Sequence, residues 1–348
     1  MNLHWRSFLV SSAANFSEPA KESSNGTPSA DTVLDFGDAR GELQAATQHT
    51  VLVPLTHLAV IEAGGADAQN FLHSQLTSDI KALAKHTARH AGWCTPKGRL
   101  LASFIVSREA DNYRLLLAED LRAFCEKRLR MYVLRAKVTL NADEALVVLG
   151  LAGAQIAETL ATAGLPCPEA LLSCARHGAI EILRLDAQRV ILFCPLAQAP
   201  DLWAQLANKA RPAGLPVWQW LDVENALPLV TLATQEAFVP QMLDLEKIGA
   251  LSFNKGCYPG QEIVARTQYL GKVKRHLYRV SATVPLLAGE EIFSPEQADQ
   301  SVGRIVNGAP TPDGGFTALA VIQANYAASA RLGARDGAAL TAHAVYAD

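Results

Sequence analysis

Residues 254–262 contain the side chains with the clearest capacity for chemistry in this sequence. Cys257 supplies a thiol, and Lys255 supplies a cation two residues before it. Gly256 and Gly260 allow backbone angles and close approaches that a side chain would block. A neighbouring positive charge favours the thiolate, which is the nucleophilic form of cysteine. The pattern predicts a reactive thiol, while a tight turn around a buried, inert cysteine is the alternative that composition leaves open.

The residues after the cysteine predict how the thiol is presented. Pro259 fixes its own backbone and biases Tyr258 toward an extended conformation. The stretch that begins with Gln261 and Glu262 can start a helix. Cys257 would then lie just before a helix N-terminus, whose partial positive charge also favours a thiolate.

The whole run reads Asn-Lys-Gly-Cys-Tyr-Pro-Gly-Gln-Glu. It resembles the signature Lys-Gly-Cys-aromatic-x-Gly-Gln-Glu of the YgfZ family of folate-binding proteins, which are paralogues of aminomethyltransferase, the T-protein of the glycine cleavage system. The similarity covers roughly residues 48–330 and includes further stretches that look like family landmarks at residues 71–79, 95–99, 223–228 and 238–241. The resemblance implies that Cys257 and Lys255 form a reactive centre. It also implies a function in the assembly or repair of iron–sulfur enzymes.

A bound folate, either tetrahydrofolate or a one-carbon derivative of it, is the second implication of the resemblance. Glu224 matches the T-protein glutamate that accepts hydrogen bonds from the pterin, and a carboxylate can accept two such bonds at once. Trp93, Gln241 and Arg266 are further candidates for contact with the folate. The structural alternatives are an exposed helix carboxylate for Glu224, a core position for Trp93 and a solvated basic face for Arg266.

One departure from T-protein concerns the strand after the first hairpin. T-protein enzymes carry an aspartate there that acts on the methylene-carrying intermediate, whereas this sequence has Leu101 and Ala102. Neither side chain can exchange a proton. The glycine cleavage reaction is therefore not expected, and a folate-binding accessory protein for iron–sulfur enzymes is the leading hypothesis. A folate-dependent one-carbon transferase, an RNA-modification factor and a pure interaction scaffold are the alternatives.

The composition indicates a globular protein in a reducing compartment. A chain of 348 residues with 49% hydrophobic residues is long enough for two or three domains. Its six cysteines lack the spacing of a zinc site or of a conventional cluster site, and they fit the cytoplasm. The net charge of −3 gives no support to direct nucleic-acid binding, and no apolar run has the length of a membrane span. The expected partners are folate and iron–sulfur proteins or their assembly factors, and no bound metal is expected.

Hydrophobic periodicity predicts an α+β fold of three units around a centre. Residues 32–144 and 212–272 are expected to form a folate-binding core domain, and residues 145–211 a ferredoxin-like unit. Residues 273–348 read as a small antiparallel β-barrel, and residues 1–31 as a mobile N-terminal segment. The resemblance to T-protein implies a ring-like cloverleaf with a central folate channel, and pockets do form preferentially at domain junctions.

Several predicted elements bear on the site. Residues 51–62 read as one strand, and a helix follows near residues 68–76. Strands near 88–94 and 99–107 are joined by a tight turn. Residues 119–134 read as a helix with a charged outer face, and such a face is normally solvated. The cations of that face are Lys127, Arg128, Arg130 and Arg135.

Overall fold

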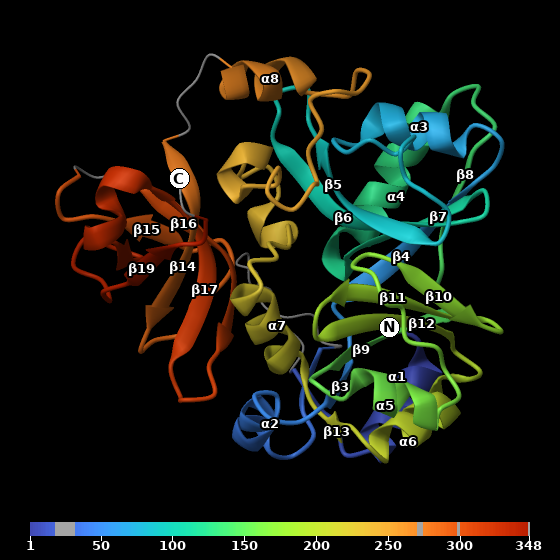
Figure 1. Cartoon of the computed structure of the whole chain (residues 1–348). Helices are drawn as coiled ribbons and strands as arrows, with labels where there is room; N and C mark the ends of the chain where they lie inside the picture. Colours follow the sequence, from blue (N-terminus) through green and yellow to red (C-terminus); the bar gives the residue numbers. More distant parts are fainter. Residues whose placement is uncertain (18–31, 270–273, 298–299, 347–348) are drawn as a thin grey trace.

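The computed structural model describes residues 1–17, 32–269, 274–297 and 300–346 of the chain. Figure 1 shows three units grouped around a central column of helices and loops. The α+β class predicted from the sequence is confirmed. Within the described ranges, no helix is both long enough and apolar enough to cross a lipid bilayer.

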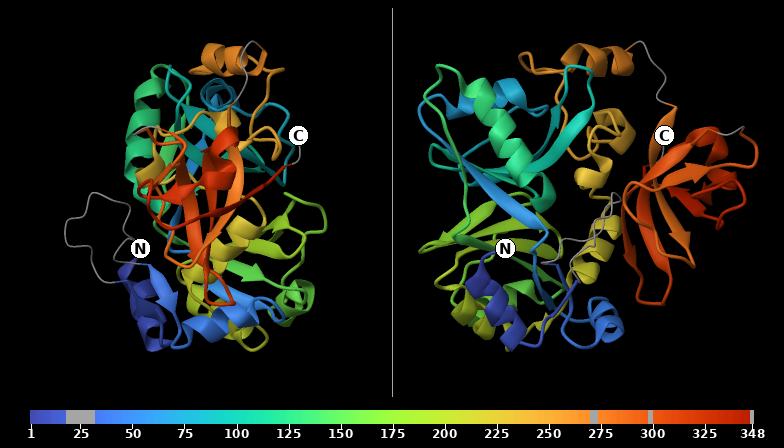
Figure 2. Two further views of the ribbon diagram at one scale, coloured as in Figure 1. Left: turned by 90° about the vertical axis from the view of Figure 1, so that its left-hand side faces the viewer. Right: turned by 180° about the vertical axis from the view of Figure 1, so that it is seen from behind.

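The first unit is built on an antiparallel sheet with the strand order β5-β6-β7-β4-β8. Its strands are β4 (Leu58–Gly64), β5 (Thr87–Cys94), β6 (Leu100–Glu109), β7 (Asn112–Ala118) and β8 (Thr139–Ala142). Helices α3 (Ala68–Gln75) and α4 (Glu119–Val133) pack on this sheet, and α4 faces the viewer in the right-hand view of Figure 2. The hairpin predicted from the sequence is confirmed, because β5 pairs with β6 across the turn at residues 95–98.

The second unit has the strand order β10-β11-β12-β9-β3-β13. Its strands are β3 (Val51–Pro54), β9 (Leu146–Ala152), β10 (Cys174–His177), β11 (Ile180–Asp186), β12 (Arg189–Pro195) and β13 (Arg211–Pro212). Helices α1 (Leu3–Ser11), α5 (Ile156–Thr162) and α6 (Ala199–Ala207) cover one face of this sheet (Figure 1). The other face packs against the first unit and the central helix α7.

The second unit is larger than the ferredoxin-like unit predicted over residues 145–211. Strand β3 lies between β9 and β13, and β13 pairs with β3 in parallel. The unit is therefore completed by residues 51–54, which come from far earlier in the chain. Periodicity marks a segment as a strand, but it does not reveal the sheet that the strand joins.

Two expectations about the N-terminal part are wrong. Residues 51–62 form two strands, because β3 and β4 belong to different sheets and the chain crosses between them at residues 55–57. The N-terminal segment is ordered over α1, where Trp5 and Leu9 are 3% and 0% exposed. These residues lie one helical turn apart, so a short helix buries both, and Trp5 meets Trp203 edge-on at 6.0 Å. Of the rest of the predicted mobile segment, residues 18–31 lie outside the described residues.

The C-terminal unit is an antiparallel sheet curled into a half-barrel, with the order β18-β15-β16-β17-β14-β19. Its strands are β14 (Arg275–Ala282), β15 (Glu291–Phe293), β16 (Gly303–Pro310), β17 (Phe316–Gln323), β18 (Arg331–Leu332) and β19 (Thr341–Ala344), with the helical turn η3 (Ala324–Ser329) after β17. Alternate residues of the strands fill its own apolar core. The predicted change to short strands after residue 275 is confirmed.

The central column connects the three units. It contains α7 (Leu215–Glu224), η1 (Leu232–Thr234), η2 (Pro240–Leu243) and α8 (Gln261–Tyr269). Helix α7 packs against β16 and β17 on one side and against β3 on the other. The short ribbon of β1 (Asn15–Phe16) and β2 (Val33–Asp35), with helix α2 (Ala39–Ala45), lies beside α7 at the lower end of the column (Figure 1).

Candidate functional site

The loop that carries Cys257 lies at the surface, directly before α8. The helix begins at Gln261, as the sequence predicts. All six cysteines are among the described residues, and Cys257 is the one that is exposed. Burial raises the pKa of Cys94, Cys125 and Cys194 to about 12 in each case. Those three thiols are therefore protonated at neutral pH, and Cys257 is the thiol in a position to react with a partner.

Lys255 fixes this loop to the end of helix α3. Its Nζ donates hydrogen bonds to the carbonyl oxygens of His73, Leu76 (2.5 Å) and Ser78 (3.0 Å). An ammonium group has three donors, so these carbonyls use all of them. Nζ also lies 5.1 Å from the centre of the Tyr258 ring, and burial lowers the pKa of Lys255 to about 8. Lys255 thus anchors the loop, a role beyond the thiolate-favouring charge that the sequence predicts for it.

Gly260 packs the loop against the turn of the β5–β6 hairpin. Its φ is +81°, and a Cβ atom there would lie 2.4 Å from the carbonyl oxygen of Thr95 and 2.8 Å from Cα of Gly98. A residue with a side chain would meet backbone at this point and would also adopt an unfavourable backbone angle. The structure therefore brings together two stretches that the sequence singled out separately, the hairpin turn and the cysteine motif.

Other motif residues hold α8 in place. Tyr258 is 6% exposed, and burial raises the pKa of its hydroxyl. Gln241, 1% exposed, donates from Nε2 to the carbonyl oxygen of Val264 at 2.6 Å, so it supports α8 from below. Glu262 and Arg266 project from α8 and are exposed. Gln241 and Tyr258 therefore help to hold the loop and α8 in place.

His73 and Asp79 lie beneath the loop, and sequence reasoning did not select them. The nearest neighbour of a Cβ atom built on Gly256 would be Nε2 of His73, at 3.5 Å. On the other side of the ring, Nδ1 of His73 lies 3.2 Å from Oδ1 of Asp79. Burial and the charge of Lys255 lower the pKa of His73, although Asp79 opposes them. The imidazole is therefore neutral at pH 7, with Nε2 facing the residue before Cys257.

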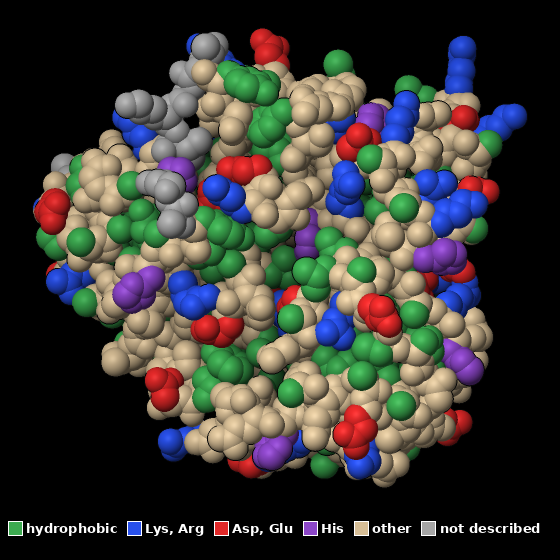
Figure 3. All heavy atoms as spheres, viewed as in Figure 1, with side chains coloured by type: hydrophobic (Ala, Val, Ile, Leu, Met, Phe, Trp, Pro, Cys, Tyr) green, Lys and Arg blue, Asp and Glu red, His purple; other side chains and the backbone are tan. Residues whose placement is uncertain are grey.

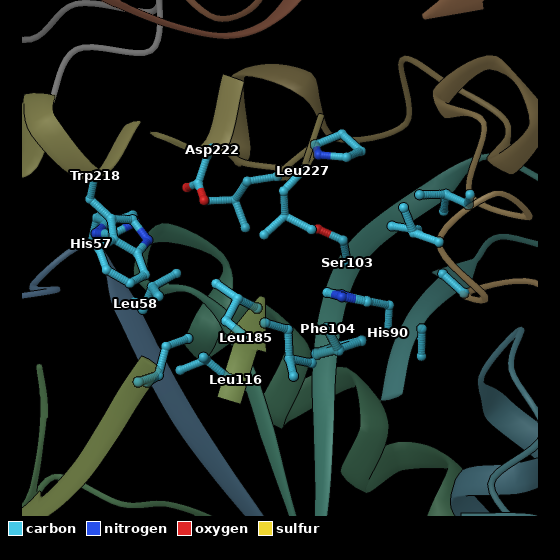
Figure 4. Close-up of a pocket in the computed structure, with 18 residues that line it drawn as sticks. His57, Leu58, His90, Ser103, Phe104, Leu116, Leu185, Trp218, Asp222 and Leu227 are labelled. Atoms are coloured by element: carbon cyan, nitrogen blue, oxygen red, sulfur yellow. The ribbon is translucent and has the colours of Figure 1, made fainter. Parts of the chain in front are cut away.

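A pocket of about 560 Å³, counting the solvent at its mouth, lies at the centre of the molecule. Its walls come from both sheets of the N-terminal half, from α7 and from residues 227–229 and 245–250. Figure 3, viewed as in Figure 1, shows hydrophobic side chains around the hollow at the centre of the molecule. Figure 4 shows Leu116, Leu185 and Phe104 at the base, with polar side chains above them. Residues of the C-terminal unit are not among those that line the pocket within the described ranges.

Asp222 supplies the carboxylate of this pocket. It is 6% exposed and accepts a hydrogen bond from Nη1 of Arg189 at 2.5 Å. Arg189 also donates from Nε to Asp186, and its guanidinium lies 5.1 Å from the centre of the Trp218 ring. Burial raises the pKa of Asp222 to about 6, although Arg189 acts in the opposite direction. At pH 7 the pocket therefore contains a buried carboxylate with one strong donor already in place.

The remaining polar groups of the pocket are uncharged at pH 7. Burial lowers the pKa of His57 to about 3 and that of His90 to about 4. Within the described part of the chain, Nδ1 of His57 is buried without a hydrogen-bond partner. Ser103 accepts a hydrogen bond from the amide of Val230 at 2.9 Å, which leaves its own hydroxyl proton available. The sequence could have flagged His57 only if the crossing between β3 and β4 had been recognised.

The four predicted folate contacts, Glu224, Trp93, Gln241 and Arg266, all lie outside the pocket lining. Glu224, at the end of α7, pairs with Nη1 of Arg279 at 3.3 Å. Trp93 is 1% exposed and packs against Phe124, with 6.3 Å between ring centres. Asp222 and Glu224 are two residues apart on a helix, so their side chains point in different directions. Sequence alone does not say which of the two carboxylates faces the ligand. No group of three or more potential metal ligands occurs in the residues that the structure covers.

Comparisons with known proteins identify relatives of this chain. No family model matches the chain. The tRNA-modifying protein YgfZ of Edwardsiella ictaluri (strain 93-146) is 32% identical over 284 residues, which cover 80% of this chain and 86% of that protein. The tRNA-modifying protein YgfZ of Sodalis glossinidius (strain morsitans) is 30% identical over 294 residues, which cover 83% of this chain and 89% of that protein.

A solved structure shares the fold. The glycine cleavage system aminomethyltransferase T from Bartonella henselae superposes with a TM-score of 0.80, and the match covers 97% of this chain and 95% of that one. Its sequence identity of 20% supports the fold alone. The T-protein-like architecture expected from the cysteine motif is thus confirmed. The two YgfZ relatives span most of the chain, and the chain belongs to the YgfZ family.

Proposed function

We propose that this protein binds a reduced folate in the central pocket and uses the thiol of Cys257 in support of iron–sulfur enzymes. The single observation that carries the proposal is the position of Cys257, the exposed thiol on a loop that Lys255 fixes at its start and that leads into α8, which the buried Gln241 supports. The relatives are named as tRNA-modifying proteins. The enzymes supported here are accordingly proposed to be iron–sulfur enzymes that modify tRNA.

The residues of the pocket fit a folate. Ligand pockets are usually apolar with a few fixed polar groups, and the lining of this pocket has that character. Trp218 offers an aromatic face at one wall. The buried Nδ1 of His57, which has no hydrogen-bond partner among the described residues, is a polar atom that a bound molecule could satisfy. A folate held there would supply a one-carbon unit or its acceptor, and the residues of this chain would bind and orient it.

Asp222 is better placed than Glu224 to orient the pterin. A pterin presents several N–H donors on one edge, and a carboxylate accepts such donors in charge-assisted bonds. Asp222 lines the pocket, whereas Glu224 is engaged by Arg279 outside it. We therefore assign to Asp222 the role that the resemblance gave to Glu224.

The residues around Cys257 can activate it without a metal ligand set. Nε2 of the neutral His73 faces Gly256, the residue before Cys257, so we propose it as the acceptor for the thiol proton, and Oδ1 of Asp79 lies 3.2 Å from the opposite nitrogen. Lys255 and Gly260 fix the loop, so they act as positioning residues. The thiolate would then be presented at the surface, where a partner protein has access to it.

Selective alkylation tests the role of Cys257. After brief iodoacetamide treatment of the native protein, mass spectrometry should find Cys257 labelled at least about tenfold faster than Cys94 and Cys194, whose thiols are buried. The Cys257→Ala variant should fold and bind folate but fail to restore iron–sulfur enzyme activity in cells that lack the protein. Cys167→Ala is the matched control and should restore it. Slow labelling of Cys257 together with full restoration by Cys257→Ala would reduce the motif to a structural turn.

A further inference from the structure

A second surface, distant in sequence from the cysteine motif, combines exposed apolar side chains with free cations. It consists of the exposed side chains of residues 127–137, the last part of α4 and the turn after it, and is called the α4 surface below. Met131 is 68% exposed, Tyr132 43% and Leu134 87%. Single exposed apolar residues are common, but a run of them is unusual on a protein surface that has no partner.

The cations of the α4 surface surround this apolar centre. Lys127 lies one helical turn before Met131, and Arg128 one turn before Tyr132, so these pairs are neighbours on the helix surface. The side chains of Lys127, Arg135 and Lys137 have neither a hydrogen bond nor an ion pair with any described residue. The sequence has no acidic residue between 127 and 142, although the whole chain has a net charge of −3. Two carboxylates lie at its edge, since Glu126 pairs with Arg130 at 2.7 Å and Asp67 accepts a hydrogen bond from the amide of Lys137, but the five cations of residues 127–137 outnumber them.

Leu134 occupies a backbone position that favours glycine. The amide of Ala136 donates to the carbonyl oxygen of Val133 at 2.8 Å, which closes a turn with Leu134 at its first central position. Leu134 has φ 48° and ψ −105°, close to the type II′ turn, where glycine dominates this position. A leucine here is unfavourable both for the backbone and for its exposed side chain. Leu134 is one of eight described non-glycine residues with positive φ, and such strained positions cluster at functional sites.

We propose that the α4 surface docks an acidic protein whose contact area has an apolar centre surrounded by carboxylates. Tyrosine, methionine and arginine are enriched at protein interfaces, and complementary charge steers association. A nucleic acid would pair with the cations and could stack on Tyr132. It has no aliphatic side chains to pack against the exposed methyl groups of Met131 and Leu134. The chain's overall negative charge also disfavours an RNA partner.

The docking surface leaves the two candidate sites open. Helix α4 packs on β4, β7 and β8, and residues 127–137 do not line the central pocket. The right-hand view of Figure 2 shows α4 along the outer side of the first unit. A partner bound there would be held on the protein while Cys257 remained exposed.

The Leu134→Gly variant tests docking, because it removes an exposed side chain without an expected loss of stability. The variant should keep or raise the melting temperature, because glycine adopts this backbone conformation without steric cost. Leu171→Gly is the matched control, since Leu171 is also exposed, at 65%, but lies elsewhere. The probe is a fluorescein-labelled helical peptide with leucines along one face and glutamates on both sides of them. Its variants carry lysine for glutamate or serine for leucine, and unfractionated tRNA is the nucleic-acid probe.

Fluorescence anisotropy in low salt should show that the acidic leucine peptide binds the wild-type protein and the Leu171→Gly variant equally. Leu134→Gly should weaken this binding by about tenfold, as the loss of a central contact does, and the double variant Lys127→Glu, Arg135→Glu should abolish it. The lysine and serine versions of the peptide should not bind. Two outcomes would overturn the proposal: equal binding of the acidic peptide to Leu134→Gly and wild type, or binding of tRNA alone at this surface.

Discussion

At the scale of single residues, the same side-chain type has opposite fates in different surroundings. Burial keeps the thiols of Cys94 and Cys194 protonated, whereas Cys257 stands exposed on its loop. Asp222 is enclosed by the pocket, whereas Glu224, two residues later, pairs with a surface arginine. Composition can propose such residues, but only their surroundings decide which of them can act.

The pH dependence of folate binding should report Asp222. Its raised pKa of about 6 means that the carboxylate gains a proton as the pH falls through 6. A protonated carboxyl accepts charge-assisted bonds less well, so tetrahydrofolate affinity should be constant above pH 7 and decline below about pH 6. His57 and His90 stay neutral until about pH 3 and 4, so they cannot cause this decline. Isothermal titration should find the decline in wild type and a flat profile in Asp222→Asn; identical profiles would exclude Asp222.

At the scale of elements, the cysteine loop depends on contacts between segments far apart in the chain. Its start is fixed by carbonyls of residues 73–78, and its end packs on the hairpin turn at residues 95–98. The loop therefore connects α3, the β5–β6 hairpin and α8. Its geometry should be sensitive to bulk at the points where backbones meet.

Gly260→Ala should destabilise the protein more than Gly249→Ala. Both glycines have positive φ, +81° and +71°, so each variant has a strain of about 1–2 kcal/mol. A Cβ atom at 260 also meets the backbone of Thr95 at 2.4 Å, whereas one at 249 meets nothing within 4 Å. The clash should add about 1–3 kcal/mol. Urea denaturation of both variants measures the difference in their free energies of unfolding. Equal free energies would show that the hairpin turn can shift to accept a methyl group at residue 260 without loss of stability.

Local elements were predictable, and their partners were not. The start of α8, the β5–β6 hairpin and the helix at α4 follow from turn residues and periodicity within short windows. The ammonium of Lys255 meets carbonyls up to 182 residues away, which no local pattern indicates. The separation of β3 from β4 likewise depends on two sheets that are completed much later in the chain. The family resemblance supplied the overall architecture that periodicity alone left open.

At the scale of the whole molecule, a T-protein-like fold carries a different set of side chains. Leu101 and Ala102 are 1% and 0% exposed on β6, where the resemblance to T-protein implies an acid. Ser103, the next residue, lines the pocket. The shared fold therefore does not imply the shared reaction.

A reconstituted glycine cleavage assay should find no turnover above background with this protein. A serine hydroxyl and buried alkyl groups cannot replace a carboxylate in proton exchange. Leu101→Asp is a useful companion, but burial of an unpaired carboxylate is expected to destabilise it. Wild-type turnover comparable to that of a genuine T-protein would favour the one-carbon transferase alternative.

The central claim is that the pocket binds a reduced folate through Asp222. Titration of tetrahydrofolate at pH 7 against tryptophan fluorescence tests it directly, because Trp218 lines the pocket. A hydrogen bond to a charged group contributes about 1.5–3 kcal/mol, so Asp222→Asn should weaken binding by about 10- to 150-fold. Glu224→Gln, the matched control outside the pocket, should bind as wild type does. Absence of saturable binding to the wild type, or a loss confined to Glu224→Gln, would contradict the account.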